Sequence, residues 1–309
     1  MKIYSIIVNY NGLQWIENCL KSTQNSSVPM QTIVIDNKST DGTVEFIETH
    51  FPDVILLKQK TNLGFGKANN LGIEYALKHN ADFFFLINQD AWIFPDTVSH
   101  LLNAYKQNPE YFILSPLFYK KDNKTFETHF KKYTSEEYCP NFNTDFNSSS
   151  TLKTVYPLNF IHAALWFLPR KCIDEVGGFD PVFPHRGEDN DFVNRVLFRK
   201  GKIGICPAAR AVHDNEVQEI NSNSLPFRIL VNRYLVIPMH ILKNINNRTS
   251  IALLNSLMYY GKGILYHLRQ LEFKGILTLL IGFCKFITKF PQLFRSRRVS
   301  IQKKANYLN

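Results

Sequence analysis

The first 90 residues alternate between short apolar runs and stretches with helical spacing, and this alternation constrains the fold more than any other feature. The predicted strands are 3–8, 32–35, 54–57 and 83–87, and the predicted helices are 13–22, 43–49 and 67–79. Strands that alternate with helices at this rhythm are typical of βαβ units in a parallel, doubly wound sheet. The sequence therefore predicts an α/β fold whose mostly parallel sheet is flanked by helices.

The remainder of the chain divides into segments of different character. Residues 120–155 are rich in Asn, Ser, Thr and Lys without clear periodicity, which predicts an irregular insert or lid. Short strands are predicted at 203–206 and 211–213, and a helical pattern begins near residue 225. With 309 residues, the chain is long enough for a main domain over 1–224 and a second region over 225–309.

Polar segments follow the predicted strands, at the edge where doubly wound sheets bind their ligands. Asp36 can accept hydrogen bonds from ribose hydroxyls or from a base N–H group. Asp90 is a natural ligand for Mg²⁺ or Mn²⁺, and His213 could complete such a shell, although a lone histidine is more often structural. The loop after the first strand lacks G-x-G-x-x-G, which argues against a dinucleotide-binding dehydrogenase.

Two further segments allow a structural and a functional interpretation. The loop at 62–70 has free backbone N–H groups and Lys67, which together can hold a diphosphate, or it is a capped strand-to-helix turn. The segment 186–191 places three carboxylates within four residues. It is either an acidic helix N-terminus or a cluster that contains a general base.

In chain order, segments 8–12, 36–42, 62–72, 88–90, 177–180 and 187–191, then Arg195 and His213, resemble the family 2 glycosyltransferases. The resemblance is to the rhamnosyltransferase-like branch, which builds bacterial surface polysaccharides, and it covers roughly residues 3 to 215. It implies a GT-A fold, a nucleotide-sugar donor, a divalent metal (Mg²⁺ or Mn²⁺) and inversion at the anomeric carbon. Residues 1–90 would form the nucleotide-binding half and 91–224 the acceptor half.

The resemblance also implies roles for single residues. Asp36 would hold the nucleoside, Asp90 and His213 the metal, and Asp189 would be the general base. The pattern departs at Asn88, which replaces an acid, and at Gln89, where the branch usually has proline. The other residues expected to bind the donor are Asn9, Asn11, Asn37, Asn62, Gly64, Phe65, Lys67, Asn69 and Asn88.

Supporting roles are expected for the neighbours of the base. Glu188 and Asp191 would assist Asp189 in catalysis. Arg195 follows Asp191 by four residues and can reach it across one helical turn. Arg186 would offset the carboxylates or touch the acceptor.

The implied reaction moves a sugar, with rhamnose as one candidate, from a UDP- or dTDP-linked donor to a glycan hydroxyl. The acceptor would be a glycan or a polyprenyl-diphosphate-linked oligosaccharide. Two alternatives are a sugar nucleotidyltransferase and a sugar-nucleotide-binding protein without transferase activity. The first would normally carry a glycine-rich, basic loop after the first strand, which this chain lacks.

Positive charge is concentrated at one end of the chain. Residues 225–309 hold 14 Lys and Arg against one acid, whereas residues 1–224 hold 22 against 25, which accounts for the net charge of +10. Charged residues interrupt the apolar runs 250–268 and 276–290, so they fit amphipathic helices on an anionic membrane better than spanning helices. A polybasic patch is expected from Arg295, Arg297, Arg298, Lys303 and Lys304. The alternative is ordinary helices packed on the main domain.

The cysteines and the charge pattern indicate the cellular compartment and the class of partner. The five cysteines are scattered without metal-ligand or redox spacing, which predicts reduced thiols in a cytoplasmic protein at the inner face of the membrane. The basic residues are interleaved with long aliphatic runs rather than clustered on one compact surface, so no nucleic-acid partner is expected.

Overall fold

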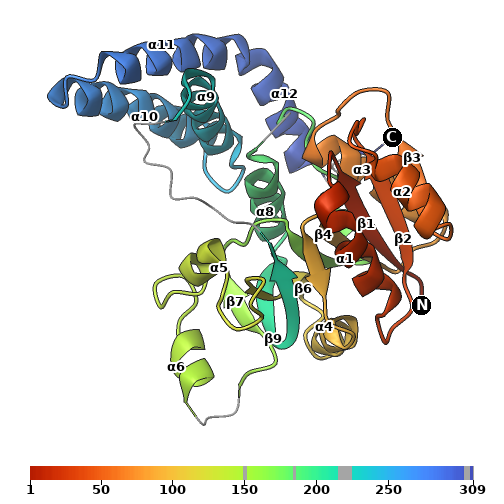
Figure 1. Cartoon of the computed structure of the whole chain (residues 1–309). Helices are drawn as coiled ribbons and strands as arrows, with labels where there is room; N and C mark the ends of the chain where they lie inside the picture. Colours follow the sequence, from red (N-terminus) through yellow and green to blue (C-terminus); the bar gives the residue numbers. More distant parts are fainter. Residues whose placement is uncertain (149–151, 184–185, 215–224, 303–306, 309) are drawn as a thin grey trace.

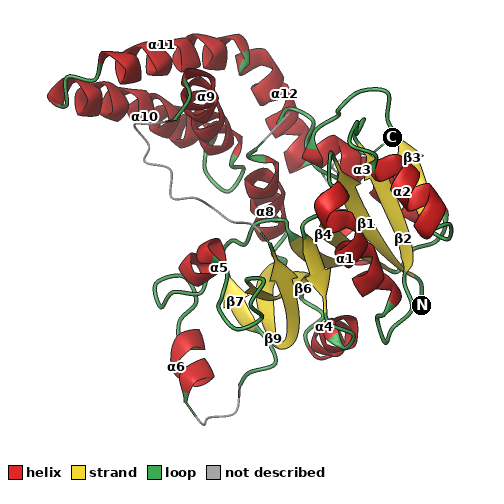
Figure 2. Ribbon diagram, viewed as in Figure 1, coloured by secondary structure: helices red, strands yellow, loops and turns green. Residues whose placement is uncertain are grey.

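The computed structural model describes residues 1–148, 152–183, 186–214, 225–302 and 307–308. An α/β body contains the sheet, and a group of long helices stands beside it (Figure 1, Figure 2). The strands are β1 Ile3–Asn9, β2 Gln31–Asp36, β3 Ile55–Lys58, β4 Phe83–Asn88, β5 Ala91–Ile93, β6 Tyr111–Tyr119, β7 Tyr156–Leu158, β8 Leu165–Pro169 and β9 Lys202–His213. The helices of the body are α1 Leu13–Gln24, α2 Thr43–His50, α3 Phe65–Lys78, α4 Thr97–Gln107, α5 Thr128–Tyr133, α6 Phe142–Asn147, α7 Arg170–Val176 and α8 Glu188–Phe198.

The sheet order places the polar strand ends beside one another. The order is β3-β2-β1-β4-β8-β6-β9-β5, with β7 paired to β9. Strand β1 runs parallel to β2 and β4, and its register sets Asn9 opposite Asp36 and Val8 opposite Asn88. Strands β4 and β8 are antiparallel, so the sheet is mixed beyond its parallel half. The predicted α/β fold with a mostly parallel sheet is confirmed.

Helix α3 packs closely against the sheet in the N-terminal half of the body. The central residues of strands β1 and β2 are mostly apolar, and Ile6, Ile7 and Ile35 are completely buried. A Cβ atom on Gly72 would lie 2.5 Å from Ile6 Cγ2, so only glycine lets α3 approach this closely.

Several predicted elements differ from the structure. The insert at 120–155, predicted as irregular, contains the short helices α5 and α6 among its described residues. Each of these helices is too short for its polar sequence to show a recognisable helical periodicity. The two strands predicted at 203–206 and 211–213 are one strand, β9, because a shift in its register against β6 bridges the segment between them.

The basic region packs onto the body as four helices: α9 Phe227–Lys243, α10 Thr249–Arg269, α11 Phe273–Thr288 and α12 Phe290–Ile301. Their core includes Val182 and Phe183 of the body. The chain then returns to α3, where the Asn70 side chain donates to the Tyr307 carbonyl at 2.9 Å (Figure 1). The predicted boundary at residue 224 lies outside the described residues and stays a prediction.

The structure corrects one part of the predicted basic patch. Arg297 is buried, and it donates to the carbonyl oxygens of Leu242 and Asn244 at 2.8 and 2.6 Å. Arg295 and Arg298 are exposed, whereas Lys303 and Lys304 lie outside the described residues. Within the described chain, no single helix has the length and apolarity needed to cross a membrane. Helices α11 and α12 meet that test only as a pair, bent by 59° at their junction.

Candidate active site

Asp36 lies at the carboxyl end of β2 in a dense hydrogen-bond network. Its carboxylate is 2% exposed and accepts from Asn9 Nδ2 at 2.9 Å, from the Ser39 hydroxyl at 2.5 Å and from the Ser39 backbone N–H at 2.9 Å. Asn11 ties the two loops together because its side-chain oxygen accepts from the Thr40 N–H at 2.8 Å. The acid predicted to hold the nucleoside is therefore held in one orientation.

Gln89 ties the end of β4 to the loop after β1. Its Oε1 accepts from the Tyr10 N–H at 2.7 Å, and its Nε2 donates to the Tyr10 carbonyl at 3.3 Å. Gly12 is required beside it, because a Cβ atom there would collide with Asn9 Oδ1 and Gln89 Oε1. A proline at position 89 would lack both of these hydrogen bonds, so the departure from the expected pattern has a structural role.

The second loop forms a backbone turn ahead of α3. Gly64 has a φ of 79°, which favours glycine, and its N–H donates to Asn62 Oδ1 at 2.9 Å. Asn37 accepts from the Leu63 N–H at 3.2 Å, which links this loop to the end of β2. Lys67 is exposed at the first turn of the helix.

The N-terminus of α3 packs against the acidic segment. Phe65 contacts Phe179 edge-on, with the ring centroids 5.7 Å apart. Asn69 is buried and donates to the Phe65 carbonyl at 3.1 Å. A Cβ atom on Gly66 would lie 3.0 Å from Phe179 Cβ and 3.5 Å from Glu188 Cβ. The loop predicted to bind the donor thus lies against the start of α8.

The acid cluster forms the N-terminus of α8. Arg186 and Gly187 both have positive φ, at 66° and 88°, and lead into the helix. Glu188 is 7% exposed, and burial raises its pKa to about 7. Burial also raises the pKa of Asp189, although its Oδ1 accepts from the Asn190 N–H at 2.7 Å. Free N–H groups at a helix start stabilise such carboxylates.

Asp191 and Arg195 point into the interior rather than toward the other acids. The predicted contact between them is present, with Arg195 Nε 2.8 Å from Asp191 Oδ2. Lys243 of α9 lies 3.0 Å from Asp191 and 2.9 Å from Asp180. Burial alone would raise the pKa of Asp191, but the Lys243 ammonium and the Arg195 guanidinium hold it below its usual value. This network fixes α8 to the helical region.

Asp90 and His213 are neighbours because β5 and β9 are paired. The register sets Ala91 opposite His213, and Asp90 Oδ1 lies 3.5 Å from His213 Nε2. His213 is 2% exposed, and neither ring nitrogen has a hydrogen-bond partner among the described residues. A carboxylate oxygen and an unpaired imidazole nitrogen fit a divalent cation.

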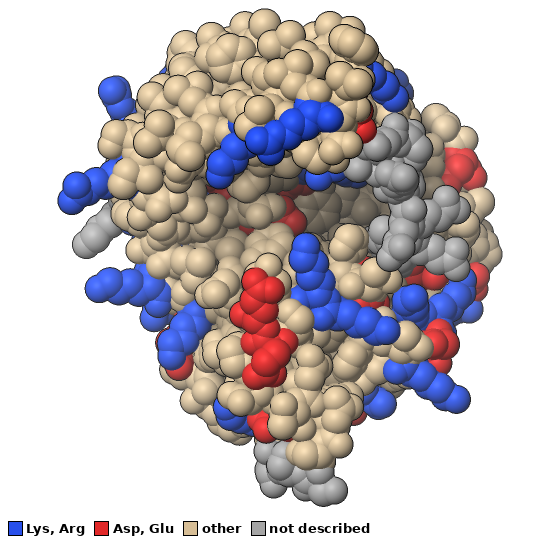
Figure 3. All heavy atoms as spheres, turned by 90° about the vertical axis from the view of Figure 1, so that its left-hand side faces the viewer, with Lys and Arg blue, Asp and Glu red and all other residues tan. Residues whose placement is uncertain are grey.

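A series of electrostatic and ring interactions links Asp189 to Asp90. Tyr133 of α5 interacts electrostatically with Asp189. Burial is the main cause that raises the pKa of the Tyr133 hydroxyl, and the charge of Asp189 adds to it. Its ring lies 5.5 Å from the His162 ring, which lies 5.4 Å from the His213 ring. Sequence reasoning missed Tyr133 and His162, since neither belongs to a recognisable spacing. Figure 3 shows a hollow between the helical region and the body, with acidic side chains in its depth.

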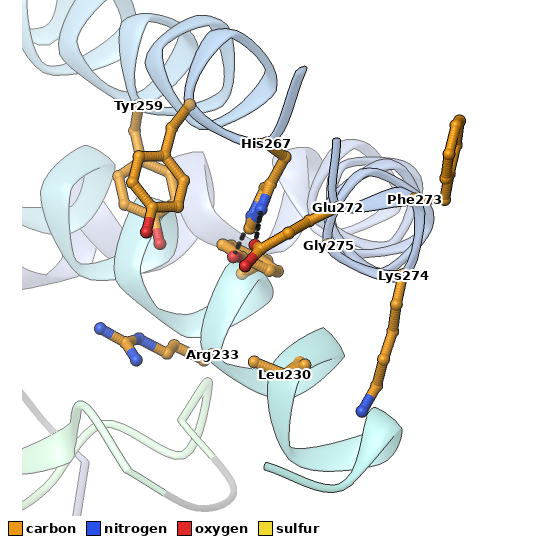
Figure 4. A pocket seen from close by; sticks show the side chains of 10 residues that line it. Leu230, Arg233, Tyr259, His267, Glu272, Phe273, Lys274 and Gly275 are labelled. Atoms are coloured by element: carbon orange, nitrogen blue, oxygen red, sulfur yellow. Dashed lines mark hydrogen bonds and ion pairs between the residues drawn. The ribbon is translucent and has the colours of Figure 1, made fainter. Parts of the chain in front are cut away.

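A separate cavity of about 570 Å³ lies within the helical region (Figure 4). At its centre His267 bridges the Tyr234 hydroxyl, at 2.6 Å, and the Glu272 carboxylate, at 2.8 Å. Arg233 and Lys274 also line the cavity. Tyrosine, phenylalanine and cationic side chains give it both apolar and polar walls.

Residues 5–177 match the family model described as Glycosyl transferase family 2. The chain belongs to this family. It is 24% identical over 236 residues to the N-acetylglucosaminyl-diphospho-decaprenol L-rhamnosyltransferase of Mycobacterium tuberculosis, covering 67% of this chain and 74% of the relative. The predicted family and the predicted glycosyltransferase class are confirmed.

Solved structures confirm the GT-A fold. Residues 1–349 of Staphylococcus aureus TarS in complex with UDP-GlcNAc align with a TM-score of 0.57 and 15% identity, over 97% of this chain and 86% of that one. This chain covers 53% of a longer TarS structure. A mannosyltransferase from Pyrobaculum calidifontis, in complex with GDP-Man and Mn²⁺, aligns with a TM-score of 0.53 and 18% identity, over 94% and 75% of the two chains.

Proposed function

We propose that this family 2 glycosyltransferase moves a sugar, with rhamnose as the first candidate, from a UDP- or dTDP-linked donor to a glycan hydroxyl. The acceptor is a lipid-linked oligosaccharide, and the product enters surface polysaccharide synthesis. The name of the mycobacterial relative, which pairs rhamnosyl transfer with a polyprenyl-diphosphate acceptor, supports this assignment. Its main support is a series of interactions across segments remote in sequence: Asp189 interacts electrostatically with Tyr133, the rings of Tyr133, His162 and His213 lie beside one another, and His213 approaches Asp90 at 3.5 Å.

The donor lies along the carboxyl ends of β1, β2 and β4. The fixed carboxylate of Asp36 accepts hydrogen bonds from the nucleoside, while the Asn9 and Asn11 loop supports it from below. Asn88 ends β4 at the same edge of the sheet, where the register pairs it with Val8, the residue before Asn9. The free N–H groups at the start of α3 meet the diphosphate, with Lys67 exposed nearby.

Asp189 acts as the general base. Its raised pKa makes it a stronger proton acceptor than an exposed aspartate, and its contact with Asn190 orients it. The acceptor oxygen bonds to the anomeric carbon, the bond from that carbon to the diphosphate oxygen breaks, and the proton passes to Asp189. The configuration inverts because the oxygen arrives opposite the departing diphosphate. Glu188 and Arg186 flank the base, while Asp191 and Arg195 position its helix.

Asp90 and His213 would hold a Mg²⁺ or Mn²⁺ ion. The unpaired ring nitrogens of His213 and the half-buried carboxylate of Asp90 have the ligand chemistry for it. When bound, the ion neutralises charge on the diphosphate.

Substituting the two acids separately tests this assignment. Asp189→Asn should lower turnover by roughly 10²–10⁴-fold, which is the usual contribution of a general base, while UDP and dTDP affinity stays unchanged. Asp36→Ala should weaken nucleotide binding. Transfer is followed by product mass and binding by calorimetry, with the exposed Asp174→Asn as control. Full transfer by Asp189→Asn would refute the base; donor binding without transfer in the wild-type chain would favour a binding protein.

A lipid-linked acceptor also accounts for the helical region. Exposed apolar side chains follow a helical stripe on α11, at Phe273, Leu277, Leu280 and Ile287. Lys and Arg side chains lie along the edge of the helical region above the hollow in Figure 3. An apolar stripe with basic neighbours fits the surface of an anionic membrane. The protein would then work at the cytoplasmic face, where the acceptor lipid is anchored.

A further inference from the structure

Three side chains from separate segments meet beside Asp90. They are Glu127 at the start of α5, His162 between β7 and β8, and His213 at the end of β9. Their potential ligand atoms all lie within 4.8 Å of one another. The two imidazole rings are inclined by 36° with their centroids 5.4 Å apart. We call these three residues the Glu-His-His cluster.

The polar atoms of the Glu-His-His cluster are buried without partners. Glu127 and His213 are 0% and 2% exposed, and His162 is half-buried with both nitrogens turned away from solvent. Glu127 Oε2 accepts from the Phe130 N–H at 2.7 Å, but its Oε1 and all four ring nitrogens have no hydrogen-bond partner in the described part of the chain. An unsatisfied buried polar group costs about 1–3 kcal/mol, so five of them in one place favour a bound ligand.

We propose that the Glu-His-His cluster binds a transition-metal dication. Two imidazole nitrogens and one carboxylate oxygen are a ligand set of zinc sites, and nitrogen ligands favour Zn²⁺ over Mn²⁺ in the usual order of affinity. Mg²⁺ prefers oxygen ligands in octahedral geometry and should bind poorly. Glu127 supplies the negative charge that a dication needs in a buried position.

The cluster extends the metal chemistry of the proposed function without depending on it. The cluster shares His213 with the proposed donor site. Asp90 does not belong to the cluster, although its Oδ1 lies 3.5 Å from His213 Nε2. Glu127 and His162 have no counterpart among the motifs that identified the family. An ion held by all three residues of the cluster would link the insert to β9 and would stay bound in the absence of nucleotide.

Metal binding to the full chain without nucleotide tests the proposal. The protein is stripped with a chelator, exchanged into buffer with Zn²⁺, Mn²⁺ or Mg²⁺, and measured for bound metal and melting temperature. The wild type should retain about one equivalent of Zn²⁺ and melt at a higher temperature, because the ion binds the native state. Mn²⁺ should give a smaller shift and Mg²⁺ the smallest.

Variants decide which residues hold the ion. Loss of an outer-shell partner already costs 10–100-fold in metal affinity, so Glu127→Gln and His162→Gln should each weaken Zn²⁺ binding by at least about 100-fold. Glu127→Gln keeps an oxygen for the Phe130 N–H, so the helix start is preserved. His129→Gln is the matched control, since its ring lies 6.2 Å from that of His162 and belongs to no cluster.

The outcomes separate this proposal from the transferase assignment. Wild-type protein that retains no Zn²⁺, or Glu127→Gln and His162→Gln variants that bind it as the wild type does, would overturn the cluster. Loss of metal in Asp90→Asn but not in those two variants would likewise overturn it and assign the ion to the donor site alone. Sugar transfer by the wild type is measured separately, and its result does not depend on either outcome of the metal-binding measurements.

Discussion

Glu188 illustrates, at the scale of one residue, what burying a carboxyl group costs in the proposed active site. Its carboxyl group is 7% exposed, and its Oε2 has no hydrogen-bond partner within the described residues. The helix start offers some compensation, but burial dominates and raises the pKa to about 7. The folded state therefore binds a proton more tightly than the unfolded chain does. Such a group lowers stability whenever it is ionised.

The substitution Glu188→Gln should remove this pH dependence. Because the folded pKa lies above the unfolded one, the stability associated with Glu188 is complete below pH 4.5 and is lost as the pH rises through 7. The variant should exceed the wild type at pH 8 by up to about 3 kcal/mol in the free energy of unfolding, and match it near pH 4. Urea titrations at both pH values measure this. An equal difference in the free energy of unfolding between the two proteins at both pH values would contradict the assigned cause.

Sequence reasoning identified acids more readily than aromatic and histidine residues. Asp36, Asp90 and Asp189 follow strands or precede a helix, so their position in a βαβ pattern suggests a common edge. Tyr133, His162 and Glu127 come from a polar stretch or an isolated segment without periodicity. Their proximity depends on how the insert folds over the sheet, which no local pattern encodes.

At the scale of elements, α8 is positioned by a buried charge network. Lys243 of α9 pairs with Asp180 and Asp191, and the Ser300 hydroxyl accepts a hydrogen bond from its ammonium at 2.5 Å. Burial alone would lower the pKa of Lys243, but the two carboxylates raise it above its usual value. The helix that carries Asp189 is therefore held by a residue from another part of the chain.

The substitution Lys243→Met should destabilise the fold strongly. It leaves Asp180 and Asp191 buried without their shared cation, and breaking a buried ion pair typically costs 3–5 kcal/mol. Chemical denaturation monitored by fluorescence measures the loss. The exposed Lys262→Met on α10 is the control and should change stability by less than about 0.5 kcal/mol. An equal effect of the two substitutions would argue against the network.

The regular elements of residues 1–90 were predicted well because burial of the strands on both faces of the sheet enforces apolar runs. The helix predicted at 67–79 begins two residues earlier, at Phe65, where Gly64 permits the turn. Four helices in the basic region exceed the two that the apolar runs indicated. Arg297 of α12 donates to the carbonyl oxygens of Leu242 and Asn244, so polar contacts within the helical region replace part of the apolar stripe of α12.

At the scale of the whole molecule, the helical region has one side packed on the body and one side exposed. One side covers Val182 and Phe183 of the body, and the other side exposes Leu277 and Leu280 of α11. Deleting residues 225–309 would uncover the buried side, so point substitutions on the exposed stripe test membrane association more cleanly.

Replacing both Leu277 and Leu280 with glutamate should weaken binding to anionic phospholipid vesicles by tenfold or more. Each leucine contributes about 1.5–3 kcal/mol when transferred from water, and glutamate adds repulsion. Both side chains are about half exposed, so the melting temperature should stay unchanged. Vesicle sedimentation at low and high salt measures the effect. Leu152→Glu on the body is the matched control, and an equal loss there would reject the stripe.

The network around Lys243 also imposes an order on biogenesis. Asp180 and Asp191 leave the ribosome first; Lys243 follows Asp191 by 52 residues, and Ser296, which donates to Asp180, follows by 116. A nascent chain that ends before these residues contains a completed sheet but two uncompensated anions at the base-bearing helix. The strands of the body are therefore translated before the later helices, whose residues complete the network around α8 and the proposed general base.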